Sequence, residues 1–404
     1  MEKTSVDVCV VGGGPAGMLL ALLLAKKGVR TLVLEQHPDF SREYRGEVLM
    51  PRFTEMFQQL HLDQWLLGLP HLKLEYGEIW WRQKRVGRFD FSFASPKAPF
   101  ALWMPQPILL NALFAKAKEY PAFDMWFGAP VKQMIQESGV RGVITQRDGK
   151  LIKIESRVVV GCDGRYSAIL REGGFELEYK DHKFDVIWFT LPKPADYDNT
   201  FRVLLSPSQS YLLLPKYPEA IQVGILTDPH GLEALKKRGL PALKRELESA
   251  HPLFKDFAAS LKDFSPFHPL QAYLHLVKDW AKDGCLLIGD AAHCCSPAGA
   301  IGVSVAVGSA IVAADVITSA LKTHPGILPA QVLAEVQRTR DADVRGIHRL
   351  QRLLTGGLLG GILPVRRLLP LIVTTLARTP LFRRAQRSLM ALPAPLPLKN
   401  DLTF

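Results

Sequence analysis

The sequence predicts an α/β fold with a Rossmann-like parallel sheet, an inserted and mainly antiparallel β-sheet, and helices at the C-terminus. Three observations lead to it. A glycine-rich turn joins a strand to a helix near the start, two later apolar strands each end at an aspartate, and runs of alternating or β-branched residues stand between these motifs. A chain of 404 residues with 48% hydrophobic content is long enough for two or more domains.

The first element is the apolar strand DVCVVG, residues 7–12, followed by a helix that begins at Pro15 and stops at Gly28. A second strand, TLVLE, ends at Glu35. The turn fits the spacing G-x-G-x-x-G, with glycines that allow a tight turn, a close phosphate and close helix packing: Gly12, Gly14 and Gly17. The helix N-terminus with Pro15 and Ala16 stabilises phosphates, and Glu35 can accept hydrogen bonds from a ribose diol. The acid disfavours a 2′-phosphate, so the pattern predicts the ADP part of FAD or NAD.

Two further strands end in the same way. RVVVGCDG places Asp163 at the carboxyl end of a β-branched run, and CLLIGD places Asp290 at the end of another. Open sheets bind ligands at this edge, although an isolated Asp-Gly pair is by default a plain turn. Three such motifs exceed what NAD needs and favour the longer FAD, with its ribityl chain.

The inserted sheet is predicted from strand-like stretches at 73–93, 184–193, 201–206, 210–218 and 220–226. Trp188, Tyr211 and Leu213 are pocket candidates on these strands, with simple core residues as the more common alternative. The predicted division assigns 1–75, 101–180 and 276–344 to the cofactor domain and 76–100 and 181–275 to the substrate domain. Residues 345–404 form the basic, leucine-rich C-terminal helices.

The cysteines and histidines predict no metal site. Five cysteines in a chain of this length do not make a disulfide framework, which favours a reducing compartment. His293 is expected to be a packed, hydrogen-bonded histidine, and Cys294 and Cys295 are expected to be small buried residues rather than redox groups. With no signal peptide and no uninterrupted apolar run of 18 residues, the predicted location is cytoplasmic.

The net charge of +11 belongs mostly to the C-terminal region. Residues 345–404 contain nine arginines, Lys399 and the single acid Asp401, so the rest of the chain carries only +2. Few aromatic residues accompany these arginines, so nucleic-acid binding is not predicted. Leucine-rich runs between them predict short amphipathic helices at an anionic membrane surface, or equally helices packed on the cofactor domain with a basic outer face.

In order and spacing, GGGPAG, CDGRYS and GDAAH with the following Pro297 resemble the three motifs of the FAD-dependent aromatic hydroxylases. These group A flavoprotein monooxygenases have the para-hydroxybenzoate hydroxylase fold and include ubiquinone-biosynthesis hydroxylases. The likeness covers about the first 345 residues. It implies that Asp163 helps to bind FAD and is linked to NAD(P)H use, and that Asp290 holds the ribityl chain. Further FAD contacts implied by the resemblance are Arg45, Gln106, Pro297, Gly299, Ala300, Ile301 and Gly302, the last five beside the isoalloxazine ring.

The resemblance implies a monooxygenase in which NADH or NADPH reduces FAD and dioxygen forms a C4a-hydroperoxyflavin. One oxygen atom then hydroxylates or epoxidises an apolar substrate of aromatic, quinonoid or quinolone-like character. The flavin carries the chemistry, so no catalytic side chain is assigned. One alternative is a flavin-dependent dehydrogenase or reductase of a prenyl or other lipid-like substrate. Another is a non-catalytic, FAD-stabilised protein that binds a membrane surface.

Overall fold

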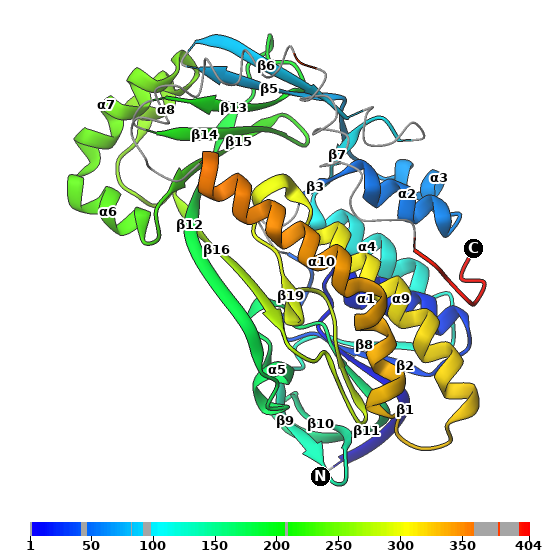
Figure 1. Cartoon of the computed structure of the whole chain (residues 1–404). Coiled ribbons are helices and arrows are strands. Elements are labelled where there is room, and N and C mark those ends of the chain that lie inside the picture. The colour runs from blue at the N-terminus through cyan, green and yellow to red at the C-terminus, as the bar shows by residue number, and fades with distance from the viewer. Residues whose placement is uncertain are drawn as a thin grey trace.

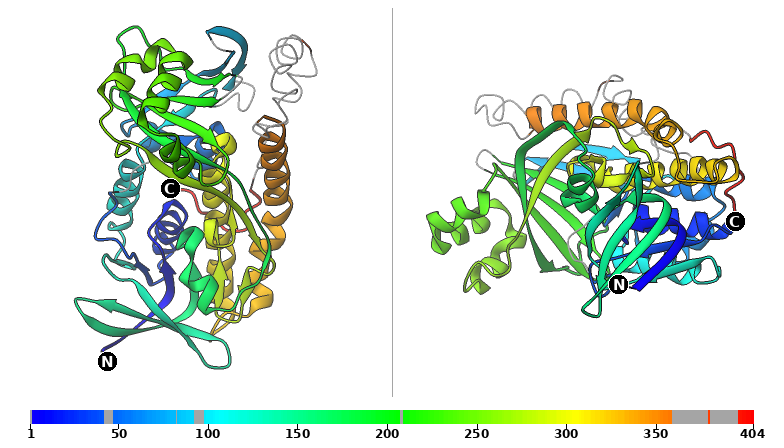
Figure 2. Two further views of the ribbon diagram at one scale, coloured as in Figure 1. Left: turned by 90° about the vertical axis from the view of Figure 1, so that its left-hand side faces the viewer. Right: turned by 90° about the horizontal axis from the view of Figure 1, so that it is seen from below.

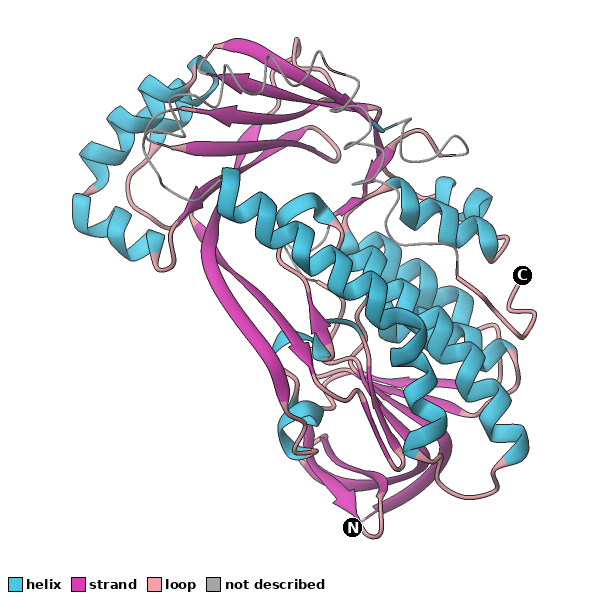
Figure 3. Cartoon of the chain, viewed as in Figure 1, coloured by secondary structure: helices cyan, strands magenta, loops and turns pink. Residues whose placement is uncertain are grey.

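The computed structural model describes residues 2–41, 47–81, 83–91, 98–206, 209–358, 379 and 396–404. Two large sheets lie at opposite ends of the molecule, and helices run along one side of it (Figures 1 and 3). The long strands β12 (Leu177–Pro192) and β16 (His268–Val277) extend from one end toward the other. The glycine-rich turn and both strand-end aspartates belong to the sheet that contains the N-terminal strand.

The first sheet, called the cofactor sheet, has the order β17-β18-β11-β1-β2-β8. Its four parallel pairings join β18, β11, β1, β2 and β8, while β10 and β9 extend it antiparallel from the outer part of β11. The bounds are β1 Glu2–Val11, β2 Thr31–Leu34, β8 Phe123–Trp126, β9 Val131–Gln136, β10 Val140–Arg147, β11 Lys150–Gly161, β17 Ala281–Lys282 and β18 Cys285–Leu287. The parallel sheet predicted from the sequence is thus confirmed.

The second sheet, called the upper sheet, has the order β19-β16-β12-β15-β14-β13-β5-β6 and is mainly antiparallel, with one parallel pair between β13 and β5. Its other bounds are β5 Tyr76–Trp81, β6 Lys84–Asp90, β13 Phe201–Leu205, β14 Ser210–Lys216, β15 Ala220–Thr227 and β19 His293–Cys294. A small sheet of β3 (Val48–Leu49), β7 (Ala101–Trp103) and β4 (Leu72–Leu74) lies between the two.

Helices cover the sheets in two groups. Helices α1, α4, α9 and α10 contact one another beside the cofactor sheet, and α6, α7 and α8 cover the outer face of the upper sheet (Figures 1 and 2). The helical bounds are α1 Pro15–Lys26, α2 Pro51–Gln59, α3 Asp63–Leu67, α4 Gln106–Ala117, α5 Ala168–Glu172, α6 Gly231–Arg238, α7 Leu240–Ala250, α8 Lys255–Ser260, α9 Gly302–Thr323 and α10 Ala330–Leu358. Short 3-10 turns are η2 Gly164–Tyr166, η3 Pro252–Phe254, η4 Gly289–Ala291 and η5 Ala298–Ala300.

The helix α9 lies at the centre of the larger core. By length and composition the stretch Ala298–Thr323 is the one described helix that could cross a membrane, but 78% of its most apolar window is buried inside the protein. Its small residues allow α1 and α10 to approach closely, as at Gly308, where a side chain would meet Arg340 of α10. The stretch is therefore a core helix of this fold.

The predicted domain boundaries stay predictions, and some fall inside continuous elements. The boundary at 344/345 lies within α10, and those at 180/181 and 275/276 lie within β12 and β16. The predicted C-terminal helices lie largely outside the described residues, because 359–378 and 380–395 are not among them. Membrane contact through this region and a cytoplasmic location likewise stay predictions.

Residues 396–404, called the C-terminal clip, return to the cofactor domain beside α9 (Figure 1). The buried carboxylate of Asp315 in α9 accepts the backbone N–H groups of Lys399 at 2.9 Å and Asn400 at 2.7 Å. The clip also buries Leu396 and Leu402, and Lys26 of α1 lies 4.1 Å from the ring centre of Phe404. Polar and apolar contacts together fix this short segment on α1 and α9.

Candidate functional site

The three motifs meet at one edge of the cofactor sheet. Leu34, Val11, Gly161 and Leu287 stand in register on neighbouring parallel strands, each at or near the carboxyl end of its strand. Directly after these strand ends come Glu35, the glycine-rich turn, the stretch with Asp163 and the stretch with Asp290. A parallel sheet therefore gathers motifs that lie more than 250 residues apart in sequence, at the edge where such sheets bind ligands.

The glycine-rich turn has the geometry that a diphosphate needs. Gly12 has φ of +106°, and a Cβ there would lie 2.5 Å from the carbonyl oxygen of Cys162. A Cβ on Gly17 would lie 2.0 Å from the carbonyl oxygen of Gly12, so helix α1 can approach the strand only without it. Gly14 is different, because a Cβ there would meet nothing within 4 Å. No side chain caps α1 at Gly14, so the space beside the helix N-terminus suits a phosphate.

Glu35 is buried and holds the glycine-rich turn. Its Oε2 accepts the N–H of Gly13 at 2.7 Å, and its Oε1 accepts the N–H of His37 at 3.0 Å. A carboxylate oxygen has two lone pairs and can accept more than one hydrogen bond, which is the property that a contact with a ribose hydroxyl requires. The position agrees with the predicted role, which itself stays a prediction.

Asp163 serves the local structure more than its sequence pattern indicates. Its carboxylate accepts hydrogen bonds from the Ser167 hydroxyl at 2.6 Å and from the N–H groups of Ala168 and Ile169 at the start of α5. Burial raises the pKa of Asp163, and these hydrogen bonds partly offset the rise. The aspartate thus fixes the loop that Gly12 contacts, and any FAD contact would use its remaining lone pairs.

Asp290 is the more available of the two aspartates. It lies in η4 with its side chain 32% exposed, and its nearest basic partner is Arg165, whose Nη2 is 3.7 Å from Oδ2. Arg165 itself donates to the carbonyl of Gln271 in β16. A carboxylate with free acceptor capacity at the strand edge suits the hydroxyls of a sugar-alcohol chain.

The loop after Asp290 is held in an unusual backbone conformation. Gly299 has φ of +80° and Ala300 has φ of +52°, directly before α9 begins at Gly302. Gln351 of α10 clamps the loop, since its side-chain nitrogen donates to the carbonyls of Ser296 at 2.8 Å and Ala298 at 2.9 Å, and its oxygen accepts the Ser296 N–H at 3.1 Å. The predicted ring-flanking residues Pro297, Gly299, Ala300, Ile301 and Gly302 all lie in or next to this clamped loop.

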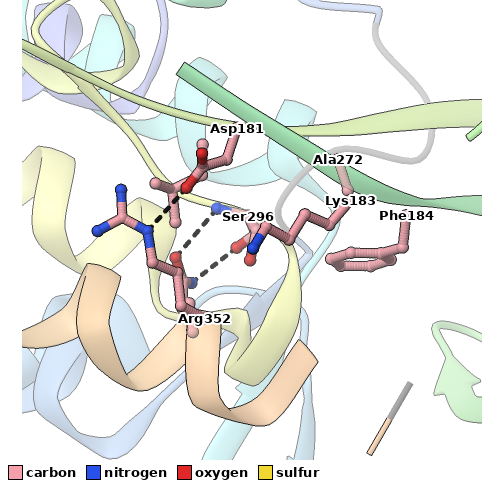
Figure 4. A pocket seen from close by; sticks show the side chains of 8 residues that line it. Asp181, Lys183, Phe184, Ala272, Ser296 and Arg352 are labelled. Atoms are coloured by element: carbon pink, nitrogen blue, oxygen red, sulfur yellow. Dashed lines mark hydrogen bonds and ion pairs between the residues drawn. The ribbon is translucent and has the colours of Figure 1, made fainter. Parts of the chain in front are cut away.

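A small pocket borders the clamp between α10, β12 and β16 (Figure 4). Asp181 and Arg352 form an ion pair at 2.7 Å on its polar side, and Phe184 and Ala272 form its apolar side. Phe184 and Ala272 also belong to the apolar cluster that contains Trp188 and contacts Ala298. The apolar side of the pocket therefore belongs to the same buried cluster as Trp188.

Buried polar residues lie behind the loop. His293 is fully buried, its Nε2 lies 2.9 Å from the Ser309 hydroxyl, and burial lowers its pKa, which confirms the expected packed and hydrogen-bonded histidine. Cys294 and Cys295 are buried free thiols whose pKa values are raised by burial. His348 of α10 lies between Tyr179 and Cys295, and burial lowers its pKa to about 4. Neutral histidines and protonated thiols are expected here at pH 7.

The pocket candidates on the upper sheet separate into two faces. Trp188 lies on the inner face, in the cluster with Ala298. Tyr211 and Leu213 lie on the outer face, buried against α7 and its neighbours, with the Tyr211 ring 5.1 Å from that of Phe254. Their assignment to the pocket is therefore wrong, because neighbouring residues on a strand point to opposite faces. Leu212 and Leu214 occupy the inner face instead.

Two other predicted contacts have different outcomes. Gln106 is buried at the first turn of α4, a helix that contacts α1. Arg45 lies outside the described residues. Among the residues that the structure describes, no cluster of three or more histidine, cysteine or acidic side chains is suited to a metal ion.

The FAD binding domain family matches residues 5–328 of the chain. The chain belongs to this FAD-binding family. The glycine-rich turn and the open space at Gly14 fit the diphosphate of FAD, and the roles of the strand-edge carboxylates stay predictions.

Several relatives are monooxygenases of aromatic compounds. A 6-methylpretetramide 4-monooxygenase from Streptomyces rimosus is 29% identical over 99% of this chain and 96% of its own length. A para-nitrophenol 4-monooxygenase from a Pseudomonas strain is 23% identical over 75% of each chain. A solved p-nitrophenol 4-monooxygenase from Pseudomonas putida superimposes with a TM-score of 0.81 at 19% identity, covering 98% of this chain and 100% of that one. The protein is an FAD-dependent oxidoreductase.

Sequence reasoning missed the contribution of α10 to the FAD site. Its buried face includes Arg340, His348 and Gln351 among valine and isoleucine residues. These residues recur at helical spacing, so polar residues on an otherwise apolar stripe were the available signal. The region from Arg345 onward was instead interpreted through its charge.

We expect Gln351→Ala to loosen residues 296–301 before α9, called the flavin loop. The change removes three hydrogen bonds and leaves buried backbone groups of Ser296 and Ala298 without this partner, at a cost of about 2–3 kcal/mol. The melting temperature and the dissociation constant of FAD measure the effect. Leu353→Ala, at a residue of the same helix that is 74% exposed, is the control. Equal behaviour of the two variants would contradict the clamp.

Proposed function

We propose that this protein uses NADH or NADPH and dioxygen to hydroxylate or epoxidise an apolar aromatic small molecule, of phenolic, quinonoid or quinolone-like character. The observation that carries the proposal is the juxtaposition of the predicted FAD site with an apolar sheet face that contacts the flavin loop at Ala298. A full-length relative that acts as 6-methylpretetramide 4-monooxygenase supports an aromatic substrate. A shorter match to a probable NADH-specific resorcinol 4-hydroxylase supports a nicotinamide co-substrate.

In this proposal the residues of the chain bind FAD and orient it. The N-terminus of α1 holds the diphosphate, Glu35 the ribose and Asp290 the ribityl hydroxyls. The N-terminus of α9, behind the loop 297–302, stabilises negative charge at the ring. Bound FAD supplies the redox chemistry, in which electrons from the nicotinamide activate dioxygen for transfer of one oxygen atom. The buried inner face keeps water away from the reacting atoms.

The expected result with purified protein is a yellow colour and release of FAD, not FMN, on denaturation. NAD(P)H oxidation should be slow alone and faster with an accepted aromatic compound. Under ¹⁸O-labelled dioxygen, mass spectrometry should find one labelled oxygen atom in the product. Turnover that proceeds equally well without oxygen, with another electron acceptor, would instead favour the dehydrogenase or reductase alternative.

A further inference from the structure

The inner face of the upper sheet contains two polar side chains among apolar ones. We define the inner face by Trp188 of β12, Gln222 and Gly224 of β15, and Leu212 and Leu214 of β14. Trp188 pairs with Gly224, which pairs with Leu212, and Gln222 pairs with Leu214, so cross-strand partners place all five on one side of the sheet. Trp188, Leu212 and Leu214 belong to the cluster that reaches Ala298 of the flavin loop.

Both polar side chains are buried without partners. The side chain of Trp188 is 6% exposed and that of Gln222 is 4% exposed. Neither Nε1 of Trp188 nor Oε1 of Gln222 has a hydrogen-bond partner within the described ranges. Leaving a buried polar group unpaired costs about 1–3 kcal/mol, so a partner supplied by a bound molecule offers a physical reason for both.

The position of the indole is fixed by its neighbour on β15. An ideal Cβ on Gly224 would lie 2.6 Å from Cζ3 of Trp188, so the six-membered ring lies against the backbone at this glycine. Gly224 thus makes room for the ring, and any larger residue would displace it. The ring is held on the sheet while the N–H group on its other edge stays without a partner.

We propose that Trp188 and Gln222 form the polar end of the substrate site, with the leucines of the inner face packing against the substrate ring. This inference rests on the proposed function and adds a chemical requirement to it. An indole N–H can only donate, so the substrate must present an acceptor, either a phenolic or a ring carbonyl oxygen. The amide of Gln222 can accept or donate, and it pairs with a hydroxyl or a second oxygen of the same aromatic system. An unsubstituted aromatic hydrocarbon leaves both groups unpaired and is discriminated against.

The test compares 1-naphthol with naphthalene, which share a ring system and differ by one hydroxyl group. Binding to the oxidised, FAD-loaded protein is followed through the flavin absorption spectrum, with no nicotinamide present. We expect wild-type protein to prefer 1-naphthol. Trp188→Phe keeps an aromatic ring but loses the N–H, and it should weaken 1-naphthol binding about tenfold while leaving naphthalene binding unchanged. Gln222→Leu should have the same selective effect.

Trp80→Phe is the matched control, because the indole N–H of Trp80 already donates to Glu78. The ring of Trp80 packs against the apolar cluster on the outer face of the upper sheet, under α6, α7 and α8. FAD content and melting temperature verify that each variant is folded. Equal weakening of both ligands, no weakening of either, or a wild-type protein without preference for 1-naphthol would each overturn the proposal. Because binding is measured without turnover, these outcomes are separate from the labelled-oxygen test of the proposed function.

Discussion

Gly14→Ala should lower the affinity for FAD about tenfold or more while leaving the stability of the apoprotein nearly unchanged. Gly14 has φ of −76° and ψ of −178°, which alanine adopts without strain, and its Cβ would enter open space. That space is where the diphosphate approaches the N-terminus of α1, so the new methyl group opposes the ligand and not the fold. Equilibrium dialysis for FAD and urea unfolding of the apoprotein measure the two quantities separately.

Two other glycines supply the comparison. Gly17→Ala should lower both FAD affinity and stability, by about 3 kcal/mol for stability, because its Cβ would lie 2.0 Å from the Gly12 carbonyl oxygen. Gly346→Ala in α10 also meets nothing within 4 Å, and it should leave FAD binding unchanged and stabilise the helix by up to about 1 kcal/mol. A Gly14→Ala protein that binds FAD like the wild type would exclude a diphosphate at this turn.

Asp315→Ala is expected to destabilise the protein by about 3 kcal/mol through loss of the C-terminal clip. The change leaves the N–H groups of Lys399 and Asn400 without their buried acceptor. It also removes the bond from the Asn400 side chain to the Asp315 carboxylate, while the bonds from that side chain to the backbone carbonyl of residue 315 and to Ser319 remain. Urea unfolding gives the free energy, and limited proteolysis should cleave the clip sooner. Asp401→Ala is the control, since this exposed acid of the same segment accepts hydrogen bonds from Thr403, which also belongs to the segment. A loss in the Asp315 variant no larger than that in the control would mean the clip contributes little.

The nucleotide-binding half of the site was predictable because its signals are local. Each glycine of the turn stands at a fixed offset from a strand and a helix, and the acid at Glu35 follows the next strand directly. The convergence of Asp163 and Asp290 on the same edge follows from parallel pairing once their strands are recognised. The capping contacts of Asp163 were not predictable, because an Asp-Gly pair does not say where the carboxylate turns.

The substrate half was less predictable because the upper sheet is buried on both faces. In β14, Tyr211, Leu212, Leu213 and Leu214 are all apolar, so the pattern does not say which alternate residues face the flavin loop. Shifting the assignment along the strand by one residue exchanges the two faces of the sheet. For this reason the sequence pattern predicts Tyr211 and Leu213 on the pocket side, although they lie on the outer face. The polar residues on the apolar stripe of α10 indicate that Gln351 is buried, but they do not identify its partner Ser296, which lies 55 residues away in the sequence.

The C-terminal clip keeps the end of the chain bound on α1 and α9. Residues 359–395 join the end of α10 to a segment bound on α1 and α9, so they close a loop through a non-covalent contact. While the chain is continuous, the clip rebinds at a high effective concentration set by the tether. A single cut within 359–395 converts it into a free peptide whose occupancy depends on its own dissociation constant and on dilution. A deletion from residue 344 onward removes the Asp315 contacts and the Gln351 clamp together, so cutting and deleting this region have different effects on the flavin domain.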